Sequence, residues 1–287
     1  MKNYLSLIKF SHTVFALPFA MIGFFLGYES SDSSFEPLLL VLVILCMVFA
    51  RSAAMAFNRW LDRDIDASNP RTVVREIPSG LVSEKAAFWF VVINSALFVM
   101  TTYFINTICF ALSPVALLVI LGYSYTKRFT AFCHLVLGLG LALAPVGAYL
   151  AVTGYFDLIP VLIGGSVLFW VAGFDVIYAL QDEGFDRSKK LHSIPVAFGT
   201  KNSMNLSSLM HFISICLIVL AVILSSQSFE SIGLLGFIGL GLFISLLIYQ
   251  HLIIKPNDLS RINLAFFTTN GVASLIFGSL FIIDLLI

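Results

Sequence analysis

The chain has 287 residues, of which 59% are hydrophobic and only 11% are charged, and its mean hydropathy is +0.99. A water-soluble protein of this length cannot cover its surface with so few charges, so soluble fold classes are excluded. Apolar runs long enough to cross a hydrocarbon core of ~30 Å recur from end to end. The sequence therefore predicts an all-α, polytopic membrane protein embedded in a lipid bilayer. We expect no nucleic-acid partner and no obligate protein partner.

Clusters of polar residues, Gly, Pro and Asn divide the chain into nine predicted membrane-spanning helices. The third and fourth are separated only by a tight turn at 105–107, so their fusion would reduce the count to eight. The predicted helices are 13–28, 37–62, 84–105, 107–125, 131–151, 158–181, 204–226, 232–252 and 264–286.

The distribution of charge favours nine helices. With that count, all 16 Lys and Arg residues fall on one set of alternate connections and the helix ends beside them. The positive-inside rule then places the N-terminus and these connections in the cytoplasm and the C-terminus outside, with the protein in the cell inner membrane. The two longest connections, 63–83 and 182–203, lie on the cytoplasmic side. The charged residues on the opposite side are all acidic, namely Glu29, Asp32, Glu36, Asp157, Glu230 and Asp284.

The first long connection follows a helix end with a column of polar side chains. In FNRWLDRDIDASNPR, which begins at Phe57, Asn58, Asp62 and Asp66 follow one another at steps of four. Arg51 lies two turns before Asn58. Residues three or four apart stack on one side of a helix, so these side chains share a face.

The second long connection follows a similar column. In GFDVIYALQDEGFDR, which begins at Gly173, Asp175, Tyr178, Asp182 and Asp186 are spaced by three, four and four residues. A charge inside a membrane span costs at least roughly 2.5–3.5 kcal/mol, so Asp175 needs a partner or a function.

Two columns of carboxylates favour a structure that holds cations between them, because like charges at adjacent turns repel. Oxygen ligands of this kind suit Mg²⁺, which bridges carboxylates to substrate phosphates. Lys127 and Arg128, in GYSYTKRFT, are candidates to bind diphosphate oxygens. The alternatives are ordinary positive-inside charge for these two residues, and ion pairs of the first column with Arg59, Arg63 or Arg71.

At these residues the chain resembles the UbiA family of intramembrane prenyltransferases. The family motif Asn-x₃-Asp-x₃-Asp is matched by Asn58, Asp62 and Asp66, and the motif Asp-x₃-Asp by Asp182 and Asp186. Tyr178, the nine predicted helices and the Lys-Arg pair after the fourth also agree, so the resemblance covers essentially the whole chain, 1–287, as a single domain. Arg59 departs from the pattern, because many members have Asp directly after the motif Asn.

The resemblance is greatest to the aromatic-acid polyprenyltransferases of ubiquinone and menaquinone synthesis. It implies Mg²⁺ held by Asn58, Asp62, Asp66, Asp182 and Asp186, a polyprenyl diphosphate donor, and an acceptor such as 4-hydroxybenzoate or a dihydroxynaphthoate. Haem and chlorophyll prenyltransferases would use the same metal chemistry, and a cation-coupled transporter would also keep carboxylates in the membrane. Such a transporter would place them near the midplane rather than at cytoplasmic helix ends, which favours the enzyme.

Roles for other polar residues follow from this hypothesis. Arg51 is a candidate for the carboxylate of the aromatic acid, unless it pairs with Asp175. Asp175 and Tyr178 are candidates to shape the site of an allylic cation, which Tyr178 would stabilise through its ring. His192 would contact the diphosphate or act as a base, or be a loop histidine with neither role.

The remaining polar residues of the apolar segments have structural interpretations. His12, His134, His211 and His251 are predicted to be interfacial, and Asn270 to pack helices through interhelical hydrogen bonds. The four cysteines match no metal-binding spacing and are interpreted as small packing residues: Cys46, Cys109, Cys133 and Cys216.

Overall fold

The computed structural model describes residues 6–7, 15–31, 34–256 and 258–287. In these ranges the named elements are all helices, eight of which are long and apolar enough to cross a membrane. The chain is therefore an all-α, polytopic membrane protein, as predicted. The first predicted span corresponds to a shorter apolar helix, α2 (Leu17–Glu29), while residues 13–14, His12 and Asp32 lie outside the described ranges. The count of nine spans and the sides of the two termini stay predictions.

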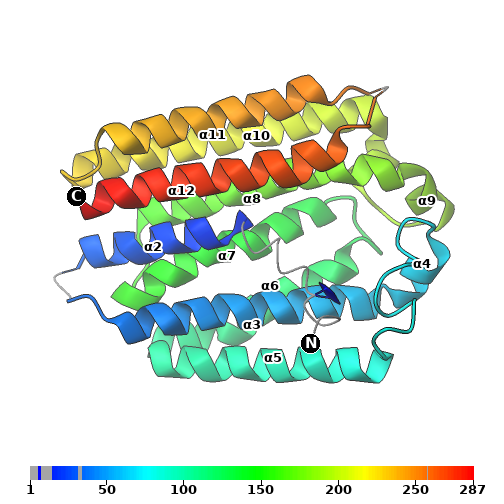
Figure 1. The fold of residues 1–287 in the computed structure, drawn as a ribbon, viewed down its shortest axis with the longest axis horizontal. Coiled ribbons are helices and arrows are strands. Elements are labelled where there is room, and N and C mark those ends of the chain that lie inside the picture. The colour runs from blue at the N-terminus through cyan, green and yellow to red at the C-terminus, as the bar shows by residue number, and fades with distance from the viewer. Residues whose placement is uncertain (1–5, 8–14, 32–33, 257) are drawn as a thin grey trace. The chain divides into compact units, whose positions relative to one another are not determined.

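The other long helices lie where the sequence predicts them, with small shifts at most ends (Figure 1). The third and fourth predicted helices are separate, because the backbone of Asn106 between them is extended. The long helices are α3 (Pro37–Leu61), α5 (Glu84–Ile105), α6 (Thr107–Thr126), α7 (Cys133–Thr153), α8 (Leu158–Ala179), α10 (Ile194–Ser228), α11 (Leu234–Ile253) and α12 (Asn270–Leu286). The short ones are α4 (Arg63–Ser68), η2 (Leu180–Asp182), α9 (Glu183–Ser188) and the π-helix η3 (Leu264–Thr269).

One boundary is wrong in the sequence prediction: α10 begins at Ile194 rather than at residue 204. Ser193 caps this helix by accepting a hydrogen bond from the N–H of Val196 at 3.4 Å, and Pro195 occupies the first turn, where no N–H is needed. Gly199 then interrupts the helix with φ 74° and ψ 165°, a conformation that glycine adopts at little cost. The predicted connection 182–203 is thus largely helical.

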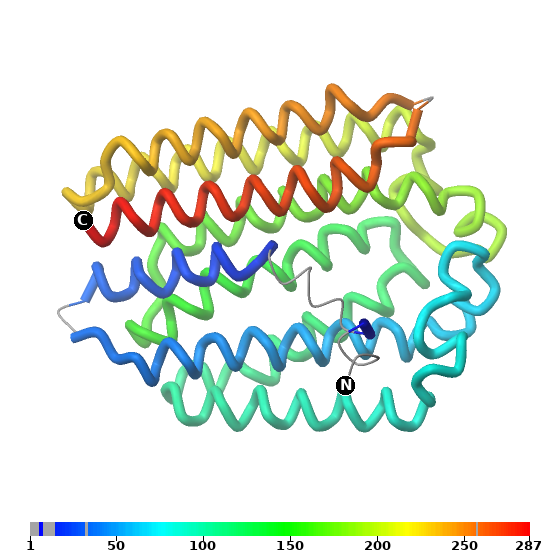
Figure 2. The backbone as a smooth tube through the Cα atoms, in the orientation of Figure 1, coloured from blue at the N-terminus to red at the C-terminus, as the bar shows by residue number. Residues whose placement is uncertain are grey.

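The chain forms two compact units. The first comprises residues 1–13 and 36–126, and its described helices are α3 to α6. The second comprises residues 14–35 and 127–287. Although α2 lies between the two parts of the first unit in the chain, it packs against α7 and α12 of the second unit (Figure 2).

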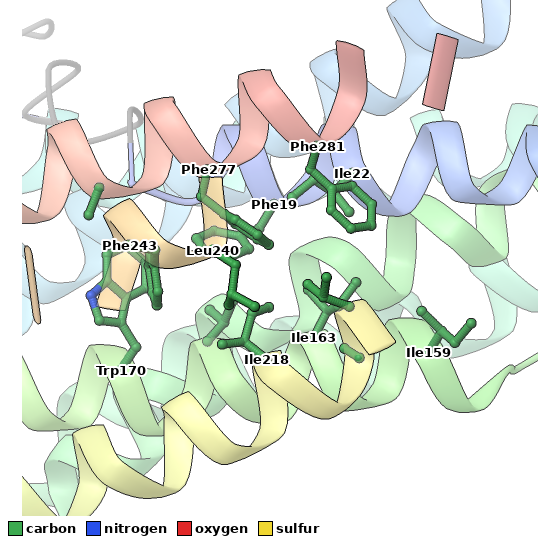
Figure 3. Packing of buried hydrophobic residues seen from close by; sticks show 14 of the residues in the cluster. Phe19, Ile22, Ile159, Ile163, Trp170, Ile218, Leu240, Phe243, Phe277 and Phe281 are labelled. Carbon is green, nitrogen blue, oxygen red and sulfur yellow. The ribbon is translucent and has the colours of Figure 1, made fainter. Parts of the chain in front are cut away.

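Large aromatic rings fill the core of the second unit. Phe19 of α2 lies against Trp170 of α8 and Phe277 of α12, with ring centroids 5.3 Å and 5.9 Å away (Figure 3). Gly23 allows α2 to approach α7 closely, because a Cβ atom at this position would lie 2.0 Å from the carbonyl oxygen of Pro145. Small residues at such contacts are typical of helices that pack in membranes.

The first unit has a smaller core and broad apolar outer faces. Tyr103 and Phe104 of α5 and Leu118 of α6 are each more than 60% exposed. Such surfaces suit contact with lipid rather than with water. The buried core residues are Leu7, Ala56, Ile77, Val82, Ala87 and Val91.

Candidate active site

The first acidic segment, residues 58–66, spans the junction of α3 and α4 in the first unit. The N–H of Asp62 donates to the carbonyl oxygen of Asn58 at 3.0 Å, and that of Asp66 donates to Asp62 at 2.8 Å. The helical register therefore continues through the junction and keeps the three side chains on one face. Asn58 Nδ2 also donates to Asp62 Oδ2 at 3.2 Å. Asp62 and Asp66 are buried, with exposed fractions of 1% and 4%.

Asp66 is neutralised by a residue that sequence reasoning missed. Arg75 Nη1 donates to both carboxylate oxygens of Asp66, at 2.7 Å and 2.9 Å. Thr72, which lies between them in sequence, donates its hydroxyl to the carbonyl oxygen of Asp66 at 3.1 Å and holds the loop close to α4. The alternatives considered from sequence were Arg59, Arg63 and Arg71, all nearer in the chain. The structure instead pairs Arg63 with Glu84, at 3.0 Å.

Two arginines of α3 have a buried Nε atom without a hydrogen-bond partner among the described residues, Arg51 and Arg59. A buried polar atom without a partner is rare and requires an explanation. Arg51 lies two turns from Asn58, on the face that carries the first acidic segment. Its guanidinium therefore has hydrogen-bonding capacity left for a ligand.

The second acidic segment, residues 175–186, lies on the second unit and has a different local structure. The helix α8 ends at Ala179, Asp182 closes η2, and Asp186 lies in α9. Both aspartates are partly exposed. The carbonyl oxygen of Asp186 accepts the N–H of Leu191 at 2.9 Å, which turns the chain back after α9.

Glu183 lies between these two aspartates, but its carboxylate is bound within the unit. One oxygen accepts from Arg187 Nη2 at 2.9 Å, and the other from the hydroxyl of Thr200 at 2.9 Å. The hydrogen bond from Thr200 connects α10 to α9. Glu183 is therefore a structural carboxylate beside Asp182, and it provides a natural control for it.

The structure brings the predicted residues Lys127 and His192 together in the second unit. The N–H of His192 donates to the carbonyl oxygen of Lys127 at 2.7 Å. The His192 side chain is exposed, while Lys127 and Arg128 are partly exposed. The turn after α6 and the segment before α10 thus lie side by side, and the side chains stay accessible.

Asp175 is paired with His134 of α7. The distance between His134 Nδ1 and Asp175 Oδ2 is 2.7 Å, and the N–H of Ile194 lies 3.4 Å from His134 Nε2. Because Nε2 accepts this N–H, Nδ1 carries the proton donated to Asp175. His134 is only 3% exposed within the protein, and its position at the membrane interface stays a prediction. It supplies the partner that a carboxylate inside a span requires.

His211 is also buried within the protein. Its Nδ1 lies 2.7 Å from His251 Nε2, and its Nε2 lies 3.1 Å from the carbonyl oxygen of Trp170. The predicted packing role of Asn270 is confirmed, because its Oδ1 accepts from Trp170 Nε1 at 2.9 Å. These contacts join α8, α10, α11 and α12.

Tyr178, one turn before Asp182, packs against an aromatic side chain that the sequence did not single out. Its ring centroid lies 4.2 Å from that of Phe266 in η3. Arg75, His134 and Phe266 were therefore missed as neighbours of predicted site residues. His134 and Phe266 are distant in sequence from the residues they contact, and Arg75 reaches Asp66 across a loop, so no helical spacing connects these pairs. Among the described residues, no group of three or more His, Cys, Asp or Glu side chains is arranged as a metal centre.

Comparison with known proteins gives consistent matches over most of the chain. The UbiA prenyltransferase family profile matches residues 16–272. The 4-hydroxybenzoate octaprenyltransferase of Aliivibrio salmonicida (strain LFI1238) is 31% identical over 241 residues, which are 83% of this chain and 81% of the relative. The enzyme of the same name from Nitrosomonas eutropha is 29% identical over 258 residues, covering 90% and 88% of the two chains.

Solved structures agree with these matches. The apo structure of a UbiA homolog from Aeropyrum pernix K1 has a TM-score of 0.83 and 32% identity, and covers 95% of this chain and 98% of that one. A UbiA homolog from Archaeoglobus fulgidus bound to GPP and Mg²⁺ has a TM-score of 0.75 over 99% of this chain and all of that one. At 22% identity, this second likeness shows the fold alone.

Proposed function

Because the chain belongs to the UbiA prenyltransferase family, we propose that it transfers a polyprenyl group from a polyprenyl diphosphate to the ring of a small aromatic acid in ubiquinone or menaquinone biosynthesis. The acceptor is 4-hydroxybenzoate or a dihydroxynaphthoate. The observation that carries this choice is Arg51, whose buried Nε has no partner among the described residues. A planar guanidinium binds a carboxylate well. Relatives named 4-hydroxybenzoate octaprenyltransferase, at about 30% identity, support the same class of acceptor.

The residues of the two acidic segments suit Mg²⁺, the metal ion of the proposal. Carboxylate and amide oxygens are the donors that Mg²⁺ takes, and Asn58, Asp62 and Asp66 present them from one helical face. Asp182 and Asp186 supply the second set. Mg²⁺, when bound, neutralises the diphosphate and assists its departure. The solved structure of a homologue with GPP and Mg²⁺ supports a divalent ion in this fold.

Basic side chains of the second unit complete the proposed diphosphate site. In this proposal Lys127 and Arg128 donate to diphosphate oxygens, and so does His192, whose backbone N–H donates to the carbonyl oxygen of Lys127. These donors stabilise the charge that develops on the leaving diphosphate as the allylic carbon–oxygen bond breaks. Asp175, held by His134, and Tyr178 shape the place where the resulting cation lies.

Arg51 orients the acceptor in this scheme by binding its carboxylate. An electron-rich ring carbon then forms the new bond to the allylic carbon, and a base removes the ring proton. The lipid tail runs toward the hydrocarbon, which explains why the reaction is carried out within a bilayer. We infer that residues 1–287 act as one transmembrane domain of the inner membrane, with the active site facing the cytoplasm.

The alternative outcome is that the protein uses the acceptor of a haem or chlorophyll prenyltransferase, since these enzymes share the same metal chemistry. Membership of an enzyme family removes the reason for a cation-coupled transporter, which would share only the carboxylates. The test is prenyl transfer by purified protein in detergent, with and without Mg²⁺. Geranyl diphosphate is offered with 4-hydroxybenzoate and, separately, with 1,4-dihydroxy-6-naphthoate. We expect Mg²⁺-dependent product with one acid, whereas binding of the diphosphate without product from either acid would contradict the proposed acceptor class.

A further inference from the structure

Two consecutive aromatic rings of the second unit lie against Tyr178. Phe266 and Phe267 belong to the π-helix η3, and their ring centroids are 4.2 Å and 6.1 Å from that of Tyr178. All three rings are partly exposed. Tyr178 lies in α8, one helical turn before Asp182, a proposed metal-binding carboxylate. The rings that contact Tyr178 are therefore close to the proposed metal site.

The π-helix positions these rings through buried hydrogen bonds. Asn270 Nδ2 donates to the carbonyl oxygens of Ala265 and Phe266, each at 3.0 Å. Asn270 Oδ1 accepts from Trp170 Nε1 of α8 at 2.9 Å. Asn270 therefore attaches the segment that carries Phe266 to the helix that carries Tyr178. Short π-helical segments are frequent at functional sites.

Two further rings pack against Phe266. The ring centroids of Phe174 and Phe15 lie 5.2 Å and 5.9 Å from that of Phe266, in edge-to-face arrangements. Phe15 and Phe174 are 5% and 3% exposed. A ring that only filled the core would be buried as these two are. Phe266 is instead partly exposed, as is Tyr178.

We propose that Phe266 and Tyr178 together form the aromatic wall that receives the allylic end of the isoprenyl group and stabilises the cation formed there. This inference rests on the proposed function, which places the diphosphate at Asp182. As the bond between C1 and the diphosphate oxygen breaks, its electron pair leaves with the diphosphate and C1 becomes part of an allylic cation. Aromatic faces attract cations most strongly where water is excluded. The wall therefore stabilises the cation until a ring carbon of the acid supplies the electron pair of the new bond.

The wall also decides which nucleophile reaches the cation. Attack by the acid gives the prenylated ring and a proton, whereas attack by water gives the isoprenyl alcohol and a proton. A leucine at position 266 leaves room beside Tyr178 and removes one ring face. Phe266→Leu is thus expected to lower kcat about tenfold and to raise the fraction of geraniol among the products.

A binding measurement tests the same residue without catalysis. The probes are an ammonium analogue of geranyl diphosphate, which mimics the cation, and its uncharged carbon isostere, each titrated with Mg²⁺ present. We expect the wild-type protein to prefer the ammonium analogue, and Phe266→Leu to reduce that preference about tenfold. Phe266→Tyr keeps the ring and should stay within about threefold of the wild type.

Phe277→Leu is the matched control, because it removes a ring of equal size from the core of the same unit, against Phe19, Phe243 and Phe281. It should lower the melting temperature and keep the preference for the cation. Phe266→Met, which also loses the ring but has a longer and more flexible side chain than leucine, carries the test if Phe266→Leu does not fold.

The outcomes separate this inference from the proposed function. A wild-type preference that persists in both Phe266→Leu and Phe266→Met overturns the aromatic wall and leaves the proposed function standing. A wild-type protein that binds neither probe with Mg²⁺ present overturns the proposed function, and the wall with it. Loss of the preference in Phe266→Leu but not in Phe277→Leu supports the wall.

Discussion

The two acidic segments have similar spacing in the sequence but different environments in the structure. In the first, Asp62 and Asp66 are buried, and Arg75 binds both oxygens of Asp66. In the second, Asp182 and Asp186 are partly exposed on η2 and α9, and the nearby ion pair of Arg187 with Glu183 lies at the surface. The first segment is thus held in place before any ligand binds, while the second is accessible.

The two segments also differ in the polar residue that lies two turns earlier in each helix. Two turns before Asn58, the Nε of Arg51 lacks a hydrogen-bond partner among the described residues. Two turns before Asp182, Asp175 is bound to His134 at 2.7 Å. The first helix therefore keeps polar capacity for a ligand, whereas the second satisfies its carboxylate internally. Substitutions in the two segments should have correspondingly different effects.

The largest expected effect is on activity, at the aspartates themselves. Asp62→Asn and Asp182→Asn should each lower prenyl transfer by at least about 10²–10³-fold, because each removes a charge that holds the metal-bound diphosphate. The assay is transfer from geranyl diphosphate at saturating Mg²⁺. Asp64→Asn, at an exposed position, and Glu183→Gln are the controls. Equal losses in a control and its aspartate neighbour would contradict the assignment.

A smaller effect is expected on stability when the Arg75–Asp66 pair is broken. Arg75→Gln leaves a buried carboxylate without its cation, and should cost about 2–3 kcal/mol, below a fully buried pair because Arg75 is 23% exposed. The measurement is thermal unfolding in detergent. Mg²⁺ should restore part of the loss, since it supplies the missing positive charge. A loss of stability that Mg²⁺ does not change would argue against a metal ion at Asp66.

Arg51→Ala should raise the KM for the aromatic acid about tenfold, because it removes charge-assisted hydrogen bonds to the carboxylate. The KM for geranyl diphosphate should change little. Steady-state kinetics with each substrate varied in turn distinguish the two. Arg51→Lys keeps the positive charge but lacks the planar guanidinium, so its KM for the acid should lie between those of the wild type and Arg51→Ala. An unchanged KM for the acid would remove Arg51 from this role.

The smallest effect is expected at the exposed ion pair of the second segment. Arg187→Gln should change the free energy of unfolding by about 0.5 kcal/mol or less, because Arg187 is 60% exposed and the pair is solvated. Thermal unfolding under the conditions used for Arg75→Gln gives a direct comparison. A loss as large as that of Arg75→Gln would show that exposure does not distinguish the two segments.

The sequence predicts the helices and the two columns well, because both depend on local periodicity. Apolar length defines α3 and α8, and steps of three and four place Asn58 with Asp62 and Asp175 with Tyr178. It also anticipates the packing role of Asn270.

The sequence does not predict partners that come from folding. His134 binds Asp175 from another helix. Phe266 contacts Tyr178 from a π-helix that no local sequence pattern predicts. The start of α10 at Ile194 depends on the cap at Ser193, inside a stretch polar enough to be interpreted as a loop. The acceptor and the length of the isoprenoid depend on the shape of a pocket, which spacing does not encode.

The central claim is the proposal that Asp62 and Asp182 hold Mg²⁺ for the same diphosphate. Its most direct test is calorimetric binding of geranyl diphosphate as a function of Mg²⁺, for wild type, Asp62→Asn, Asp182→Asn and the double variant. A shared site predicts that each single variant removes most of the Mg²⁺-dependent affinity and that the double variant loses little more, because coupled residues are not additive. Wild-type, Mg²⁺-dependent affinity in either single variant would contradict the claim.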